Sequence, residues 1–131
     1  MVEKYPLFLI HQHDAERVGL HHDLRLEQNG VLVSWAIPKL MPGSSDKRRL
    51  AIKMPDHPME SATFEGQSIG MLRIIEEGYG KGTVEIWDEG YYIPINITDN
   101  MYFIQFRGEK IGGNYYIKHW EGKNWLIWKQ K

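Results

Sequence analysis

The chain has 131 residues, which is the size of one domain that can bury a core without covalent cross-links. It contains no cysteine, so disulfides and thiolate metal sites are excluded, and a bound metal would need imidazole, carboxylate or other oxygen ligands. The 16 Lys+Arg against 17 Asp+Glu give a net charge of -1, which argues against a broad non-specific polyanion binder but allows a local basic site.

The first apolar run, in MVEKYPLFLIHQHD, is far too short to span a bilayer, and it ends in histidines rather than at a small-residue cleavage site. Together with the lack of cysteine, this predicts a cytoplasmic protein without membrane association. In an extended segment, His11 and His13 would lie on the same face of a strand.

The next segment predicts a β-hairpin over about residues 20–37. Asn29-Gly30 separates LHHDLRLEQ from VLVSWAI, and a type I′ turn needs two residues that tolerate positive φ. The alternative is a helix capped by Asp14, because Leu20 and Leu24 have helical spacing. We favour the strand, since Gly19 inside a helix would cost about 1 kcal/mol and the turn requires an extended segment before it.

Side-chain alternation along this strand sorts its residues onto two faces. One face is mainly apolar, and the other carries His21, Asp23, Arg25 and Glu27. Neutral imidazole and carboxylate suit Mn²⁺, Zn²⁺ or Fe²⁺, while a guanidinium matches phosphate oxygens bidentately. The face therefore indicates a metal and anion site, although any lone histidine is more often an ordinary surface or core residue. Further ligands could come from His11, His13 or His57, and less readily from His119.

Short runs rich in β-branched and aromatic residues continue to the end of the chain. The predicted strands are RLAIKM, MLRII, GTVEIWD, YYIPINI, MYFIQFRG, NYYIKHW and NWLIWKQK, with turns at Glu89-Gly90, Asp99-Asn100 and Glu121-Gly122. We expect an all-β single domain, 1–131, that forms a small closed barrel of short antiparallel strands rather than a sandwich. EGYGKGTVEIW is interpreted as a glycine-rich turn, because no helix follows it to bind a phosphate.

Eight motifs in order resemble the 3′-phosphoesterase domain of bacterial DNA ligase D, which also occurs as stand-alone archaeal proteins. They are HDAER, LHHDLRLE, GVLVSWAIPK, DKRRLAI, DHPMESATFEG, EGYGKGTVEIWDEG, GEKIGG and WLIWK. The resemblance implies a β-barrel hydrolase with long active-site loops and a divalent metal, best Mn²⁺, with Zn²⁺ or Co²⁺ as alternatives. Its substrates would be primer-template DNA ends that carry a 3′-phosphate or a 3′-terminal ribonucleotide in non-homologous end joining, and a repair DNA ligase or polymerase would be a partner.

The resemblance also implies roles for individual residues. His13, Asp23 and His57 correspond to metal ligands, and His21 and Arg25 to residues that engage the scissile phosphate. Lys39 and Arg49 correspond to further basic active-site positions, and Ser61 stands where the family usually has a tyrosine near the phosphate. The family gives no role to His11, His22 or His119.

Three departures from the family affect these expectations. Val18-Gly19 lengthens the segment before LHHD by two residues, which keeps His11 as an alternative ligand to His13. The hydroxyl at Ser61 is shorter than that of a tyrosine. Few residues precede FLIHQHD, where ligase-fused members have an arm that helps to remove the ribonucleoside, so we expect 3′-phosphate removal to be the faster activity.

The chemistry predicted from these residues is attack of water on a phosphate beside a metal ion, with Arg25 offsetting the growing charge. His21 would carry a proton or donate a hydrogen bond to the phosphate. Two alternatives stay open: a nucleic-acid-end binding module with weakened catalysis, and a metallophosphatase that acts on small molecules.

Overall fold

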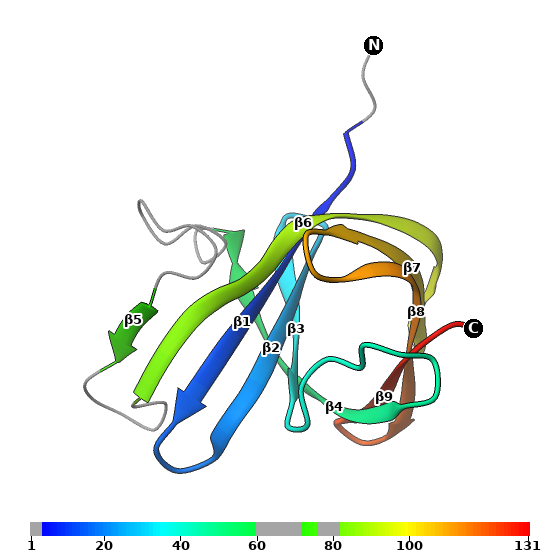
Figure 1. The fold of residues 1–131 in the computed structure, drawn as a ribbon. Helices are drawn as coiled ribbons and strands as arrows, with labels where there is room; N and C mark the ends of the chain where they lie inside the picture. Colours follow the sequence, from blue (N-terminus) through cyan, green and yellow to red (C-terminus); the bar gives the residue numbers. More distant parts are fainter. Residues whose placement is uncertain (1–3, 60–71, 76–81) are drawn as a thin grey trace.

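The structure is a computed structural model that describes residues 4–59, 72–75 and 82–131. Nine β-strands make up the regular structure of this part of the chain (Figure 1). They are β1 (Leu7–Ala15), β2 (Gly19–Gln28), β3 (Val31–Ile37), β4 (Arg48–Pro58), β5 (Leu72–Ile75), β6 (Gly82–Thr98), β7 (Met101–Gly108), β8 (Gly112–Glu121) and β9 (Asn124–Lys129). The same residues contain no helix long and apolar enough to cross a membrane.

The strands form one antiparallel sheet in the order β1-β2-β3-β4-β9-β8-β7-β6-β5. An additional pairing of β1 with β6 closes eight of these strands into a barrel, and β5 pairs with β6 outside the closed ring. The predicted all-β closed barrel is therefore confirmed. Closure removes free strand edges from the ring, so its backbone N–H and C=O groups can find partners without a covering helix.

The β2–β3 hairpin forms as its turn residues predict. Asn29 and Gly30 have φ angles of 52° and 81°, the positive values that a two-residue hairpin turn requires. Pairing runs from His22 opposite Ile37 to Gln28 opposite Val31. The helical alternative for this segment is therefore wrong, because the turn and the cross-strand bonds both need an extended chain.

The turn predicted at Glu89-Gly90 is wrong, because β6 continues through it as one strand of 17 residues. Gly90 pairs with Phe8 of β1 and also with Gly108 of β7, so β6 passes here from one neighbour to the other. A Cβ at Gly90 would lie 2.2 Å from the carbonyl oxygen of Arg107. The glycine therefore permits a close strand approach inside the sheet and does not end the strand.

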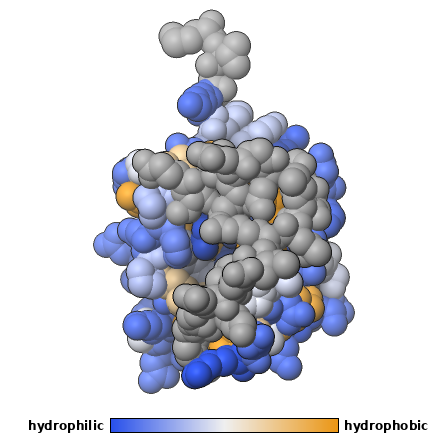
Figure 2. Space-filling model, turned by 90° about the vertical axis from the view of Figure 1, so that its left-hand side faces the viewer, coloured by the Kyte–Doolittle hydropathy of each residue, from blue (hydrophilic) through white to orange (hydrophobic). Residues whose placement is uncertain are grey.

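Alternation decides which side chains fill the barrel. Leu24 and Leu26 of β2 are fully buried against Phe8, Trp35 and other core residues. Burying each such side chain stabilises the fold by roughly 1.5–3 kcal/mol. The same alternation turns the residues between them away from the core, so the polar face of β2 lies outside the barrel. On the side of the molecule shown in Figure 2, hydrophilic residues predominate among those described.

Candidate metal and phosphate site

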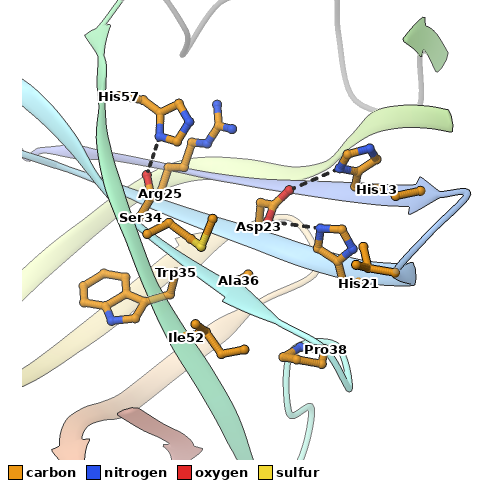
Figure 3. A pocket seen from close by; sticks show the side chains of 13 residues that line it. His13, His21, Asp23, Arg25, Ser34, Trp35, Ala36, Pro38, Ile52 and His57 are labelled. Carbon is orange, nitrogen blue, oxygen red and sulfur yellow. Dashed lines mark hydrogen bonds and ion pairs between the residues drawn. The ribbon is translucent and has the colours of Figure 1, made fainter. Parts of the chain in front are cut away.

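A cavity of about 540 Å³ lies against the outer faces of the first four strands, and its lining combines polar and apolar side chains (Figure 3). Figure 3 shows a polar group of side chains from β1, β2 and β4 on one side and apolar side chains from β3 and β4 on the other. The lining residues are His13, Ala15, Val18, His21, Asp23, Arg25, Ser34, Trp35, Ala36, Pro38, Ile52, Met54 and His57.

His21 lies between two hydrogen-bond acceptors. Its Nδ1 is 3.1 Å from the carbonyl oxygen of Gly19, and its Nε2 is 3.3 Å from Oδ1 of Asp23. A carbonyl only accepts, so Nδ1 carries a proton, and Nε2 of the neutral ring would then face the carboxylate with a lone pair. The pair needs a cation between them, either a second proton or a metal ion. The hydrogen bond to Asp23 accordingly raises the pKa of His21.

His13 completes a group of three possible metal ligands. Its Nδ1 is 3.7 Å from Oδ2 of Asp23, so each carboxylate oxygen faces one imidazole. One ligand atom from each of His13, His21 and Asp23 lies within 4.8 Å of the others. Two ligand atoms that each lie about 2.1 Å from a single ion are at most about 4.2 Å apart, so the three side chains would move closer together around a bound ion. The residues present therefore fit a divalent metal with N and O ligands.

Asp23 is held in its charged form by this group. Burial acts to raise the pKa of its carboxyl, but the hydrogen bond with His21 and the positive charges of nearby groups, including Arg25, outweigh burial and lower that pKa. A deprotonated carboxylate that joins two imidazoles is the form required of a metal ligand.

His57 lies on the same cavity but outside this group of three. Its Nδ1 is 3.0 Å from Oγ of Ser34, and the Ser34 hydroxyl donates to the carbonyl oxygen of Leu32 at 3.2 Å. This arrangement requires Nδ1 of His57 to carry the proton. Burial, followed by the charge of Arg25, lowers the pKa of His57, which favours the neutral ring near neutral pH.

Arg25 brings a partly buried positive charge to the cavity, and Figure 3 shows its side chain extending beside His57. Burial lowers the pKa of its guanidinium, against the opposing effect of Asp23. Its Nε is buried and has no hydrogen-bond partner among the residues that the structure describes. A buried donor without an acceptor is costly, so an anion in the cavity would stabilise it.

Comparison with known proteins identifies the family. The model of the DNA ligase D 3′-phosphoesterase domain matches residues 11–119. The chain belongs to this family. The multifunctional non-homologous end joining DNA repair protein LigD of Mycobacterium tuberculosis is 40% identical over 128 residues, which is 95% of this chain and 16% of that protein.

Two further LigD proteins also match 95% of this chain. The multifunctional non-homologous end joining protein LigD of Mycolicibacterium smegmatis is 38% identical over 135 residues, covering 95% of this chain and 17% of the relative. The protein of that name from Pseudomonas aeruginosa is 34% identical over 133 residues, covering 95% and 15%. The chain thus spans less than a fifth of the length of these relatives. The family resemblance predicted from the motifs is confirmed.

Three other residues were given a role by the resemblance to the 3′-phosphoesterase family, namely Lys39, Arg49 and Ser61. Lys39 is exposed in the turn after β3, and Arg49 is on β4 with its Nε buried and without a partner in the described part of the chain. Neither is among the residues that line the cavity. Ser61 lies outside the described residues, so its predicted phosphate contact stays a prediction.

The histidines without a family role occupy distinct places. His11 is buried and has a pKa of about 3, lowered by burial and then by Arg25, and it is outside the group of three. His22 is also buried, and its Nδ1 accepts a hydrogen bond from the backbone N–H of Met41 at 2.9 Å. His119 is 2.9 Å from the carbonyl oxygen of Gly122 in the β8–β9 turn. The geometry thus favours His13 over His11 as a ligand.

Sequence reasoning missed two features of the site. Ser34, which positions His57, is the single hydroxyl in the apolar run VLVSWAI, and its outward register opposite Arg25 was an available signal. The apolar wall formed by Pro38, Ile52 and Met54 gave no such signal, because apolar residues in strands usually face a core.

Proposed function

We propose that this chain is a metal-dependent phosphoesterase that removes a phosphate from the 3′ end of DNA during end joining. One observation carries the proposal. The possible metal ligands His13, His21 and Asp23 share a cavity with Arg25, whose buried Nε has no hydrogen-bond partner in the described part of the chain. A site that accepts both a metal and an anion suits hydrolysis of a phosphate ester. Membership of the 3′-phosphoesterase family supports the choice of a DNA end as substrate.

We assign the metal to His13, His21 and Asp23, which changes two of the roles expected from the resemblance. There His57 was a ligand and His21 engaged the phosphate. The three ligand atoms that lie together include His21, whereas Nδ1 of His57 is held by Ser34. A divalent ion, with Mn²⁺ proposed, would act as a Lewis acid beside the phosphate. The carbonyl of Gly19 fixes the His21 tautomer that leaves Nε2 available.

The remaining side chains orient the substrate and move the proton. Arg25 holds phosphate oxygens and offsets the charge that grows on them as water attacks phosphorus. His57 is kept largely neutral and is steadied by Ser34, so it accepts the proton of the attacking water. The bond from phosphorus to the 3′ oxygen breaks, and this oxygen takes up a proton from solvent, so the products are inorganic phosphate and a 3′-hydroxyl end.

Two variants test the assignment of the ligands. We expect His21→Ala to weaken Mn²⁺ binding at least tenfold and to abolish phosphate release, because one of three protein ligands is removed. His57→Ala should abolish turnover while Mn²⁺ binding stays within about threefold of wild type. Titration calorimetry measures binding, and phosphate release from a 3′-phosphate primer-template measures activity.

The same assay separates the alternative functions. Wild-type activity on the primer-template that disappears in chelator supports the proposal, whereas equal activity on a free nucleotide monophosphate would indicate a small-molecule metallophosphatase. Binding of the DNA end without turnover would indicate an end-binding module. A primer that ends in one ribonucleotide tests ribonucleoside removal, which we propose to be slower than phosphate release. Cytoplasmic location and cooperation with a repair ligase or polymerase are part of the proposal.

A further inference from the structure

The outer face of β4, β9, β8 and β7 carries three rows of side chains that run across the strands. Pairing sets the rows, and alternation places their members opposite the buried residues Ala51, Trp125, Ile127, Tyr115 and Ile117. The first row is Arg48, Trp128, Tyr116 and Phe103; the second is Leu50, Leu126, Lys118 and Met101; the third is Ile52, Asn124 and Glu121. We call these residues, with Trp120, the aromatic face. Each of them is partly or fully exposed.

The first row is a continuous stack. Phe103 and Tyr116 have ring centroids 4.2 Å apart, and Tyr116 and Trp128 have centroids 5.1 Å apart, with interplanar angles of 14° and 21°. The Arg48 guanidinium lies 4.6 Å from the centre of the Trp128 ring. These rings stabilise the sheet across three strands, and each of them is partly exposed.

Trp120 differs from that stack because its side chain is 61% exposed. The register of β8 and β9 shifts between His119 and Glu121, so Trp120 is the extra residue of a β-bulge. Bulges redirect a side chain, and Trp120 directly precedes Glu121 of the third row. A tryptophan exposed to this extent offers a large ring on which a partner can stack.

The aromatic face and the cavity share a residue. Ile52 belongs to the third row and lines the cavity. Trp120 stands two strands away from it, across β9, at a separation of about 10 Å given ordinary strand spacing. β4 contributes Ile52, Met54 and His57 to the cavity, and in Figure 1 its lower right end lies beside β9.

The charge of the aromatic face is positive although the chain as a whole has a net charge of -1. Its rows and the adjoining β8–β9 turn carry Arg48, Lys118 and Lys123, all exposed, against the single carboxylate of Glu121. Exposed aromatic rings among cations are the combination that binds single-stranded nucleic acid, through base stacking and phosphate contacts.

We propose that the aromatic face binds a single-stranded stretch of nucleic acid adjoining the 3′ end held in the cavity, with Trp120 stacking on an unpaired base. This inference rests on the proposed function, which identifies the bound group as a DNA 3′ end. It adds a second surface that contacts the nucleic acid. Duplex bases are already stacked on their neighbours, so the surface is specific for an unpaired segment such as the extension of the opposite strand. Lys118 and Arg48 would contact its phosphates.

Binding is measured by fluorescence anisotropy of labelled DNA in chelator, so the assay is independent of turnover. One duplex carries a recessed 3′-phosphate opposite a single-stranded 5′ extension, and a second duplex is blunt. We expect Trp120→Ala to raise Kd for the extended duplex by about 5- to 100-fold, the range of one lost base stack, and to leave Kd for the blunt duplex within twofold. Trp120→Phe should restore most of the affinity because it keeps a stacking ring.

Matched controls separate stacking from loss of structure. Tyr91→Ala removes an aromatic ring that is 41% exposed on β6, outside the three rows, and it should leave both Kd values unchanged. Lys118→Gln should lower the slope of log Kd against log salt for the extended duplex by about 1. Unchanged affinity for the extension in Trp120→Ala, or an equal loss on the blunt duplex, overturns the proposal.

The proposed function is judged separately, by phosphate release from the wild-type protein with Mn²⁺. A protein that releases phosphate but binds both duplexes equally keeps the proposed function and loses this surface. A protein that binds the extension through Trp120 but releases no phosphate does the reverse.

Discussion

At the scale of single residues, Arg25 combines a positive charge with a fixed donor geometry in the cavity. It projects from the polar face of β2 into the cavity, its pKa is lowered by burial, and its Nε has no acceptor within the described residues. A lysine keeps the charge but offers a point ammonium in place of a planar fork of donors. The contribution of Arg25 is therefore expected to depend on the geometry of its donors as well as on its charge.

We predict that Arg25→Lys lowers kcat/KM for phosphate release from a 3′-phosphate primer-template on the order of 100-fold, comparable to the loss of one preorganised transition-state donor. Mn²⁺ affinity should stay close to that of the wild type, because Arg25 is not a ligand. Steady-state kinetics and calorimetry provide the two readouts. A rate within threefold of wild type would show that Arg25 makes no bidentate contact with the phosphate.

At the scale of elements, the β7–β8 connection is fixed by one buried carboxylate. Asp88 of β6 is completely buried and accepts hydrogen bonds from the backbone N–H groups of Glu109, Lys110 and Ile111 at 2.8–3.0 Å. A Cβ at Gly108 would lie 2.4 Å from its Oδ2, so only glycine fits beside it. The motif GEKIGG is therefore explained as a turn that wraps a carboxylate.

We predict that Asp88→Asn lowers the free energy of unfolding by about 2–4 kcal/mol, because an amide has one acceptor oxygen and its NH₂ group would face backbone donors. Urea denaturation measures the loss. Asp99→Asn, in the exposed turn between β6 and β7, is the matched control and should change the free energy of unfolding by less than about 0.5 kcal/mol. Equal stability of the two variants would refute the role given to Asp88.

At the scale of the whole molecule, the fold buries His11 and His22 with lowered pKa values, which predicts a loss of stability in acid. Burial lowers the pKa of His22 to about 4, and burial followed by Arg25 lowers that of His11 to about 3. Both are neutral in the folded and unfolded states above pH 6.5. Between that pH and the folded pKa the unfolded chain binds the proton and the folded chain does not, so stability falls as pH falls.

We predict that replacing His22 by Gln reduces the loss of folding stability at acid pH. Gln can still accept from the N–H of Met41 but does not titrate, so the variant should lack a loss of about 3 kcal/mol that the wild type shows between pH 6.5 and 4. Urea unfolding of the metal-free proteins at each pH gives the comparison. Taking the difference between the two proteins cancels the opposite contribution of His21, whose raised pKa favours the folded state in acid. Parallel pH profiles would contradict the prediction.

The sequence by itself determined the strands and the face that carries the site. Period-two alternation, together with the positive φ tolerated by Asn29-Gly30, predicted the hairpin and placed His21, Asp23 and Arg25 side by side. These are local properties, because the direction of a side chain in a strand follows from the residue's position in that strand. The family motifs added the site's expected chemistry.

The tertiary structure alone decided which side chains meet across strands. The continuity of β6 through Gly90 depends on its passing from β1 to β7, and no local pattern indicates that. His13 reaches Asp23 only because β1 pairs with β2 in a particular register, and His57 meets Ser34 across the β3–β4 pair. Distances between residues remote in sequence depend on strand register and barrel closure, so the grouping of His13 with His21 and Asp23 followed from the fold and could not be read from spacing.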